Sequence, residues 1–208
     1  MSSTRKRWYR GQAIPVADEI MDALRDAGAV DASRLLWVGS LRRNKADVGD
    51  VEILFVPVRG LAPDQGDLFG SMIETDKAAD AINALVKRGV LAKRPKEDGT
   101  FTWGAQNKLA VHTATGMPVD LFAATVETWP NLLVCRTGPA ALNAIIAQRA
   151  KDRGWRWNPY GAGFYGPDGQ LKVPVRCEAD VFQAVDLPPT DPIYRDRLAQ
   201  QIQEAGRV

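Results

Sequence analysis

Two apolar, strand-like segments that carry acidic residues constrain this chain more than any other feature of its sequence. A buried strand is predicted at 51–58, and it begins within a run that holds Asp50 and Glu52. A second predicted strand at 117–123 carries Asp120. Residues two apart on a strand point to the same face, so the first two carboxylates project together. If the two strands are neighbours in one sheet, the third carboxylate joins them.

Three converging carboxylates are costly unless cations neutralise them. All-oxygen ligation suits Mg²⁺, which binds through a few carboxylates together with water and substrate phosphates. The chain has one histidine, His112, so a site with several histidine ligands is excluded. Its two cysteines, Cys135 and Cys177, are too few for a disulfide scaffold or a thiolate zinc site. The sequence therefore predicts a magnesium site, with Mn²⁺ as the alternative ion.

Residues before the acidic pair are suited to binding phosphate. Gly39 and Ser40 follow an apolar run at a strand-to-helix or strand-to-loop junction, where backbone N–H groups and a hydroxyl are available to phosphate oxygens. Arg43, with Arg42 beside it, has the charge to neutralise a triphosphate. Two metal ions would complete a phosphoryl-transfer site. The alternative is a solvated basic loop beside acidic turn residues, and the Gly-Ser pair at this spacing favours the phosphate site.

The composition is that of a globular protein, since 45% of the 208 residues are hydrophobic and 25% are charged, with a formal net charge of +2. No apolar stretch approaches the roughly 18–20 residues that a membrane span needs. The basic N-terminus is followed by polar residues and not by the apolar core of a secretion signal. We therefore expect a cytoplasmic protein that is monomeric and has no membrane partner.

Hydrophobic spacing predicts an α+β fold. The predicted elements are mixed helices and strands up to Arg136 and mainly helices after it. Helices are expected at 16–27, 76–88, 139–153, 178–185 and 193–205. Strands are expected at 34–38, 51–58, 101–103, 108–113, 117–123 and 132–135. The chain is accordingly divided into a basic tail at 1–12, a mixed α/β domain at 13–136 and a smaller, mainly helical domain at 137–208.

Basic residues alternate with aromatic residues in two places, which is typical of proteins that bind a phosphate backbone and stack on bases. The first place is the N-terminus, where Arg5, Lys6, Arg7 and Arg10 flank Trp8 and Tyr9. The second is the C-terminal domain, where the predicted nucleic-acid-binding residues are Arg149, Lys151, Arg153, Arg156 and Tyr160. A solvated helix face beside a small aromatic core is the alternative interpretation.

The Gly-Ser pair, the basic loop, the Gly-Asp-x-Glu run and the distal strand with Asp120 resemble the nucleotidyltransferase superfamily built on the palm of DNA polymerase beta. The C-terminal third is similar to the thumb of the family X DNA polymerases. That similarity is carried by Arg136-Thr137-Gly138, Asn143, Arg149-Ala150, Gly154, Asn158-Pro159-Tyr160-Gly161 and the run from Glu178 to Pro189, with Pro192 and Arg195 beyond it. The resemblance spans roughly residues 13 to 197 and implies a nucleotidyltransferase palm with a mixed sheet, followed by a small thumb-like subdomain.

The resemblance also implies roles for individual residues. Asp50 and Glu52 would ligate two Mg²⁺ ions, and Asp120 would ligate the catalytic ion and draw the proton from a primer 3′-OH. The β- and γ-phosphates of a dNTP would be held by Gly39, Ser40, Arg43 and Gly49. Thr137 and Gly138 would form the turn beside the sugar, and Asn143 would read the incoming base. The implied function is a small DNA polymerase that acts in DNA replication or repair on primed or gapped DNA.

Several positions depart from the family pattern. Glu52 stands where Asp is usual, and Cys135-Arg136 stands where an aromatic pair precedes Thr-Gly. The longer carboxylate changes the reach to a metal, and the lost aromatic pair bears on sugar selection. Alanines at 140 and 147 replace larger residues that usually contact the nucleotide and template. Two alternatives therefore stay open: template-independent transfer to RNA, a protein or a small molecule, and a nucleic-acid-binding module whose active site has decayed.

Overall fold

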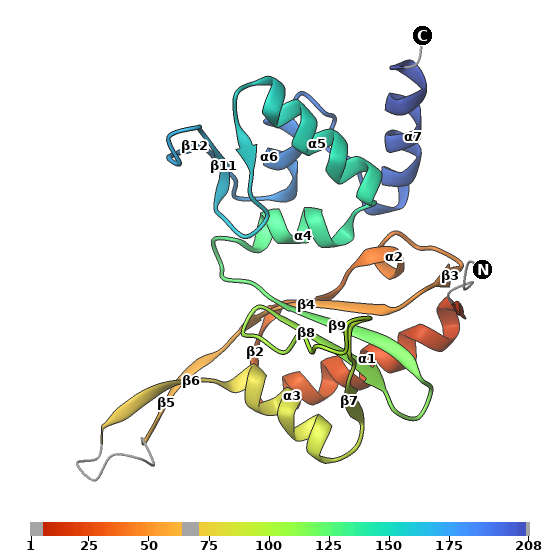
Figure 1. Cartoon of the computed structure of the whole chain (residues 1–208), viewed down its shortest axis with the longest axis vertical. Helices are drawn as coiled ribbons and strands as arrows, with labels where there is room; N and C mark the ends of the chain where they lie inside the picture. The colour runs from red at the N-terminus through yellow and green to blue at the C-terminus, as the bar shows by residue number, and fades with distance from the viewer. Residues whose placement is uncertain (1–5, 64–70, 207–208) are drawn as a thin grey trace.

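A five-stranded mixed sheet forms the centre of the N-terminal part in the computed structural model, which describes residues 6–63 and 71–206 (Figure 1). Within the sheet, β4 and β9 are parallel and the other neighbouring pairs are antiparallel. The order of the strands is β2 (Val30–Trp37), β4 (Val51–Pro57), β9 (Met117–Ala123), β8 (Asn107–His112) and β7 (Leu91–Lys93). The strands expected at 51–58, 108–113 and 117–123 are confirmed.

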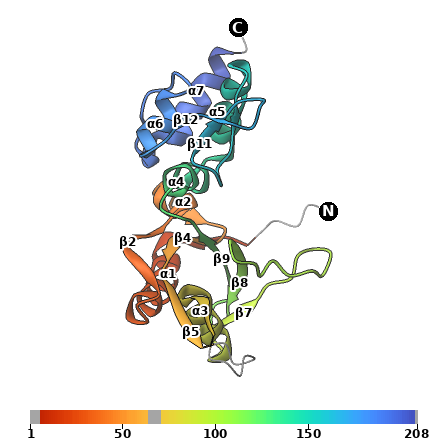
Figure 2. The ribbon, with the colours of Figure 1, turned by 90° about the vertical axis from the view of Figure 1, so that its left-hand side faces the viewer.

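Helices cover both faces of this sheet. The helices on one face are α1 (Arg10–Asp26) and α3 (Lys77–Lys87), and the helix on the other is α4 (Trp129–Thr137) (Figures 1 and 2). Val51, Ile53 and Phe55 of β4 are buried in the cluster that contains α1 and α3, whereas Leu54 and Val56 are buried with α4. This alternation follows from the two-residue repeat of a strand, and it places even-numbered residues of β4 on the α4 face.

The N-terminus is more structured than its polar sequence indicates. Within the predicted tail at 1–12, β1 (Trp8–Tyr9) pairs with β3 (Asp47–Val48), and α1 begins at Arg10, earlier than the predicted start at residue 16. Apolar periodicity detects only the turns of a helix that pack on the core, and the first turn of α1 is polar. Residues 1–5, including Arg5 of the predicted basic cluster, lie outside the described residues.

The C-terminal part has its own core and its own small sheet. Its elements after α4 are α5 (Ala140–Asp152), β10 (Arg156–Trp157), β11 (Gly163–Tyr165), β12 (Leu171–Pro174), α6 (Glu178–Gln183), the 3₁₀ turn η1 (Pro192–Tyr194) and α7 (Arg195–Ala205). Phe164 and Phe182 are fully buried at the centre of this core. The predicted helices at 139–153, 178–185 and 193–205 are confirmed, with ends that shift by a few residues.

Some predicted strands are wrong. Residues 132–135 lie in α4, because a four-residue apolar run fits a buried helix as well as a strand. Residues 101–103 form isolated bridges and no strand. The short helix α2 (Gly39–Arg42) has no counterpart among the predicted elements. The same holds for a hairpin of β5 (Arg59–Pro63) and β6 (Met72–Asp76), which extends away from the sheet in Figure 1. Among the described residues, no helix is both long and apolar enough to cross a membrane.

Candidate active site

The structure brings the three predicted carboxylates to one region of the sheet. Glu52 on β4 is the direct cross-strand partner of Asp120 on β9, and the pairing is parallel. Asp50 immediately precedes β4, two residues before Glu52. Leu54 and Phe122, two residues beyond the paired acids on their strands, are buried with α4. The acids therefore lie on the face of the sheet that turns toward α4 and the C-terminal part.

Glu52 is the most perturbed of these groups. Burial, together with the negative charges of Asp50 and Asp120, raises its pKa to about 8. The positive charges of Arg136 and Arg43 act in the opposite direction but do not outweigh burial. Repulsion within the set shows that the three carboxylates sense one another.

Gly39 makes room for the Glu52 side chain. A Cβ atom at residue 39 would lie 1.6 Å from Oε2 of Glu52, and the φ angle of this glycine is +59°. The turn that contains it is joined to the strand, because the amide of Val38 donates to the carbonyl of Glu52 over 2.8 Å. Glycine is therefore required here both for its backbone conformation and for the close approach of the carboxylate.

The chemistry of this donor set fits a divalent cation. Three hard carboxylate oxygens with mutual repulsion are the ligands that Mg²⁺ prefers, and a cation would relieve the repulsion on Glu52. Asp120 pairs with Arg94 of the β7–β8 connection, a residue that the sequence analysis did not single out. Within the described residues, no group of three His, Cys, Asp or Glu side chains is arranged so that it could hold a metal ion. Metal ligation by Asp50, Glu52 and Asp120 stays a prediction.

Two of the predicted phosphate-binding residues, Ser40 and Arg43, directly follow the turn at Gly39. Ser40 lies in α2, and Arg43 caps this short helix. The Arg43 guanidinium donates to the carbonyl of Thr137, and its Nε lies 3.1 Å from Asp196. Gly49 lies beside Arg7, whose Nη1 is 4.0 Å from the position of a Cβ on that glycine.

Arg7 places a further cation at this region, and Asp47, with a smaller contribution from Asp50, raises its pKa. From the sequence, Arg7 is expected only to belong to the basic N-terminus. Its pairing with Asp47 over 2.7 Å across the β1–β3 contact brings it to the acidic loop.

The residues predicted to contact the sugar and base lie at the end of α4 and in α5. Thr137 is the last residue of α4, and Gly138 caps it with a φ angle of +66°. Asn143 in α5 donates from Nδ2 to the carbonyl of Cys135 over 2.7 Å. Its Oδ1 is buried without a hydrogen-bond partner among the described residues. The amide is thus held against the backbone, with its acceptor oxygen uncommitted.

Arg136 is a site residue whose role the sequence analysis did not foresee. Its guanidinium carbon lies 3.8 Å from the centre of the Phe122 ring, and it donates a hydrogen bond to the hydroxyl of Tyr160. Tyr160 in turn donates to Oδ1 of Asn107 over 2.9 Å. Arg136 therefore joins the carboxylate-bearing face of the sheet to the C-terminal part, at the position where an aromatic residue was expected.

Comparison with known proteins adds to this geometry. Residues 132–196 match the family model of the DNA polymerase beta thumb. The chain is also similar to the crystal structure of Leishmania infantum polymerase beta in a ternary P/T complex, with a TM-score of 0.68 and 19% sequence identity over 92% of this chain and 77% of that chain. The chain has the fold of DNA polymerase beta. A search of curated proteins finds no match.

The predicted α+β palm and thumb-like form, and the resemblance to family X polymerases, are therefore confirmed. We call the part around the five-stranded sheet the palm and the part from α5 to α7 the thumb. An ionic network joins the two. Arg42 of the palm donates two hydrogen bonds, of 2.8 and 2.7 Å, to Glu178 of the thumb. Arg195, which is 1% exposed, also donates to Glu178 over 2.9 Å.

The five predicted nucleic-acid-binding residues do not form one continuous exposed surface. Arg149 and Arg153 bind the chain near Val185 and Asp186, so their guanidinium groups have partners within the thumb. The hydroxyl of Tyr160 is held between palm residues. The other two side chains, those of Lys151 and Arg156, are exposed and line a hollow.

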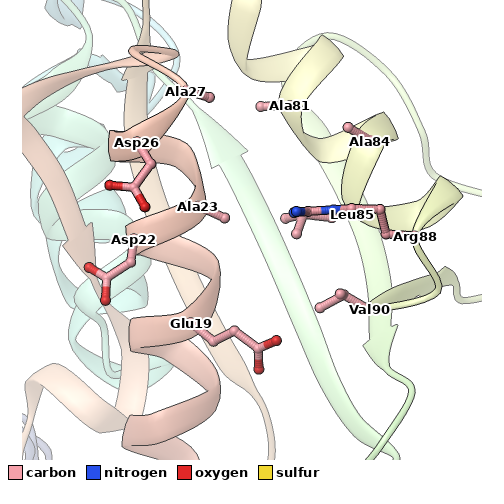
Figure 3. A pocket seen from close by; sticks show the side chains of 10 residues that line it. All are labelled: Glu19, Asp22, Ala23, Asp26, Ala27, Ala81, Ala84, Leu85, Arg88 and Val90. Carbon is pink, nitrogen blue, oxygen red and sulfur yellow. The ribbon is translucent and has the colours of Figure 1, made fainter.

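A larger hollow, of about 680 Å³, lies between α1 and α3 and is separate from the carboxylates (Figure 3). Its lining includes four alanines, and Glu19 of α1 projects toward α3. Glu19 also approaches His112, with 3.2 Å between its Oε2 and the ring Nε2. The histidine is 6% exposed, as expected of a packed strand residue. None of the residues that line this hollow belongs to the predicted active site.

Proposed function

We propose that this protein is a metal-dependent nucleotidyltransferase that adds dNMP to a DNA 3′-OH with release of pyrophosphate. The observation that carries the proposal is the parallel pairing of Glu52 with Asp120, next to Asp50, in a fold of the polymerase beta type. Two Mg²⁺ ions held by these carboxylates would lower the pKa of the attacking hydroxyl and stabilise the leaving pyrophosphate.

Residues of the palm supply the other parts of the reaction. Asp120 accepts the proton of the 3′-OH, and its pairing with Arg94 fixes where the carboxylate lies. Ser40, Arg43 and the backbone at Gly49 hold the β- and γ-phosphates, with Arg7 at the same edge. The similar Leishmania infantum polymerase beta was crystallised as a ternary P/T complex, which supports DNA as the acceptor of this chain.

A specific observation favours template-independent transfer as the second candidate. The Nδ2 group of Asn143, which would read the base, already donates to the carbonyl of Cys135. Arg136 also occupies the position of an expected aromatic residue. Both features weaken the contacts that would select a base or a sugar.

A substrate panel separates the candidates. The purified protein is incubated with labelled dNTPs or NTPs and with gapped, primed or single-stranded oligonucleotides, in Mg²⁺ or Mn²⁺. Extension that follows the template sequence supports the polymerase, and tailing of all acceptors supports the second candidate. DNA binding without incorporation under any of these conditions contradicts both and favours a decayed binding module. Reactions without divalent cation provide the matched blank.

A further inference from the structure

The thumb contains a second hollow that the proposed reaction does not use. Its volume is about 430 Å³, which lies within the range of ligand-binding sites. It forms where the end of α5, the start of β10 and the turn between β11 and β12 meet. The side chains and backbone that line it belong to Lys151, Gly154, Trp155, Arg156, Gly166, Pro167 and Gly169.

The two charged side chains that line this hollow have no partner in the described part of the chain. The side chains of Lys151 and Arg156 are exposed and make no hydrogen bond or ion pair there, unlike those of Arg149 and Arg153. Trp155 is half-buried, and its ring lies 6.2 Å from that of Phe164, which anchors it on one side. None of the described residues that line the hollow is acidic. The hollow is therefore lined by two cations and one anchored aromatic ring, together with three glycines and a proline.

This combination suits a nucleotide whose base is not paired. A base stacks on an aromatic side chain only when it is free of its own helix, and the two cations suit the phosphates on either side of it. A paired base has both faces covered by its neighbours. The hollow therefore favours single-stranded nucleic acid over a duplex.

The hollow lies near the part of the thumb that contacts the predicted sugar-binding turn. Tyr160, four residues after Arg156, bonds to Arg136 beside the predicted sugar-binding turn. Four residues span at most about 14 Å. A DNA strand advances about 3.4 Å per nucleotide, so the backbone positions of Arg156 and Tyr160 lie within about four nucleotide steps of each other.

We propose that Lys151, Trp155 and Arg156 form a subsite for an unpaired nucleotide of the template overhang. The base stacks on Trp155, and the adjacent phosphates bind Lys151 and Arg156. The inference rests on the proposed function, because that function places a primer–template end at the palm.

The test compares two DNA ligands on the full chain. Both contain the same primed duplex, and one carries a single-stranded 5′ template overhang while the other is blunt. The variants are Trp155→Leu, Trp155→Phe and the double variant Lys151→Ala/Arg156→Ala. The matched control, Arg176→Ala/Arg197→Ala, removes the same charge from exposed thumb positions outside the hollow. Thermal melts verify folding, and Trp155→Phe retains an aromatic ring at the packed position.

The wild-type protein is expected to bind the overhang DNA about tenfold more tightly than the blunt DNA, which corresponds to one stacked base. Trp155→Leu and the double cation variant should abolish this difference, with less than about twofold change on blunt DNA. The double variant should also reduce the salt slope by about 1.4, as expected for two phosphate contacts on a single strand. Trp155→Phe and the control should retain the preference.

Placing 2-aminopurine at successive overhang positions locates the stacked base. Quenching at one position, lost in Trp155→Leu, supports the subsite. Equal losses on both DNAs, or an overhang preference that survives in Trp155→Leu and in the double cation variant, overturns it. Nucleotide incorporation measured on the same DNA separates this subsite from the proposed function. If the protein incorporates nucleotides but its preference for overhang DNA does not depend on the residues of the hollow, only the subsite is refuted. If that preference depends on these residues but no nucleotide is incorporated, only the proposed function is refuted.

Discussion

The sequence around Glu52 predicts the face of the sheet on which its side chain lies, but it does not predict the burial of that side chain. Its spacing from Asp50 on an apolar strand predicts that the two carboxylates share a face. Its burial depends on the turn at Gly39, which lies over the side chain and bonds to the backbone of the strand. No local pattern reports that approach, so the raised pKa of Glu52 could not be predicted from the sequence.

Replacing Glu52 by Gln is expected to alter how stability depends on pH. The pKa of this group is about 8 in the folded protein, above its ordinary value near 4.3. Between these values the folded state holds a proton that the unfolded chain has released, so stability falls as pH rises, by about 1.4 kcal/mol per pH unit. Thermal melts in chelating buffer from pH 5 to 8 should show this fall in the wild type and not in Glu52→Gln.

Glu97→Gln, at an exposed position, is the control and should follow the wild type. Adding Mg²⁺ at pH 8 should raise the melting temperature of the wild type and not that of Glu52→Gln, because an ionised ligand binds the cation. The same pH slope in all three proteins would contradict the burial of this carboxylate.

Gly39→Ala is expected to destabilise the protein and to displace Glu52. The backbone penalty at a positive φ angle and the contact with the carboxylate together should cost about 2 kcal/mol or more. Gly116→Ala is the matched control, because its φ angle of +71° carries the same penalty while nothing lies within 4 Å of the added atom. Denaturant melts that give equal losses for the two variants would mean that the side chain of Glu52 does not require the glycine.

At the level of elements, α4 explains why part of the fold escaped prediction. Leu132 and Leu133 pack against the palm sheet, whereas Val134 belongs to the thumb core. A helix buried on two sides has no polar face, so its short apolar run was assigned to a strand. The long helices and central strands, which are amphipathic or uniformly apolar, were predicted correctly. Contacts between α2, α6 and α7 join residues distant in sequence, and no periodicity detects them.

Glu178→Gln should weaken the connection between palm and thumb. The variant leaves Arg195 buried without its charged partner and should cost about 3 kcal/mol, which lowers the melting temperature by about 6 to 12 °C. Burial raises the pKa of Glu178, but the hydrogen bonds and charges of Arg42 and Arg195 outweigh it and lower the pKa overall.

Ionised Glu178 therefore stabilises the folded protein at pH values above the ordinary pKa of glutamate. This stabilisation is lost as the pH falls through the lowered pKa of Glu178. The stability difference between Glu178→Gln and the wild type should shrink as pH is lowered below about 4. Glu204→Gln, on the exposed face of α7, should leave the melting temperature unchanged. A constant difference across this pH range would contradict the role of the ion pairs.

For the whole molecule, the sequence predicts the order of the structural elements along the chain better than it predicts how those elements are arranged in space. The Gly-Ser turn, the acidic strand and the distal strand with Asp120 predict a palm, and the thumb pattern locates the second part. The sequence does not show that the strand with Glu52 and the strand with Asp120 are neighbours. The structure shows that these strands, β4 and β9, pair in parallel. The basic residues of the thumb were grouped by sequence, whereas folding directs some of them inward to backbone carbonyls and others to the hollow.

Pyrophosphate release during addition of one dNTP to primed DNA is the measurement closest to the central claim. The wild-type protein should release one pyrophosphate for each nucleotide added, only when a divalent cation is present. Asp120→Asn should lower the rate by about a thousandfold, while its melting temperature shows that it is folded and Glu97→Gln retains full activity. Incorporation by folded Asp120→Asn at the wild-type rate would contradict the assignment of these carboxylates to nucleotidyl transfer.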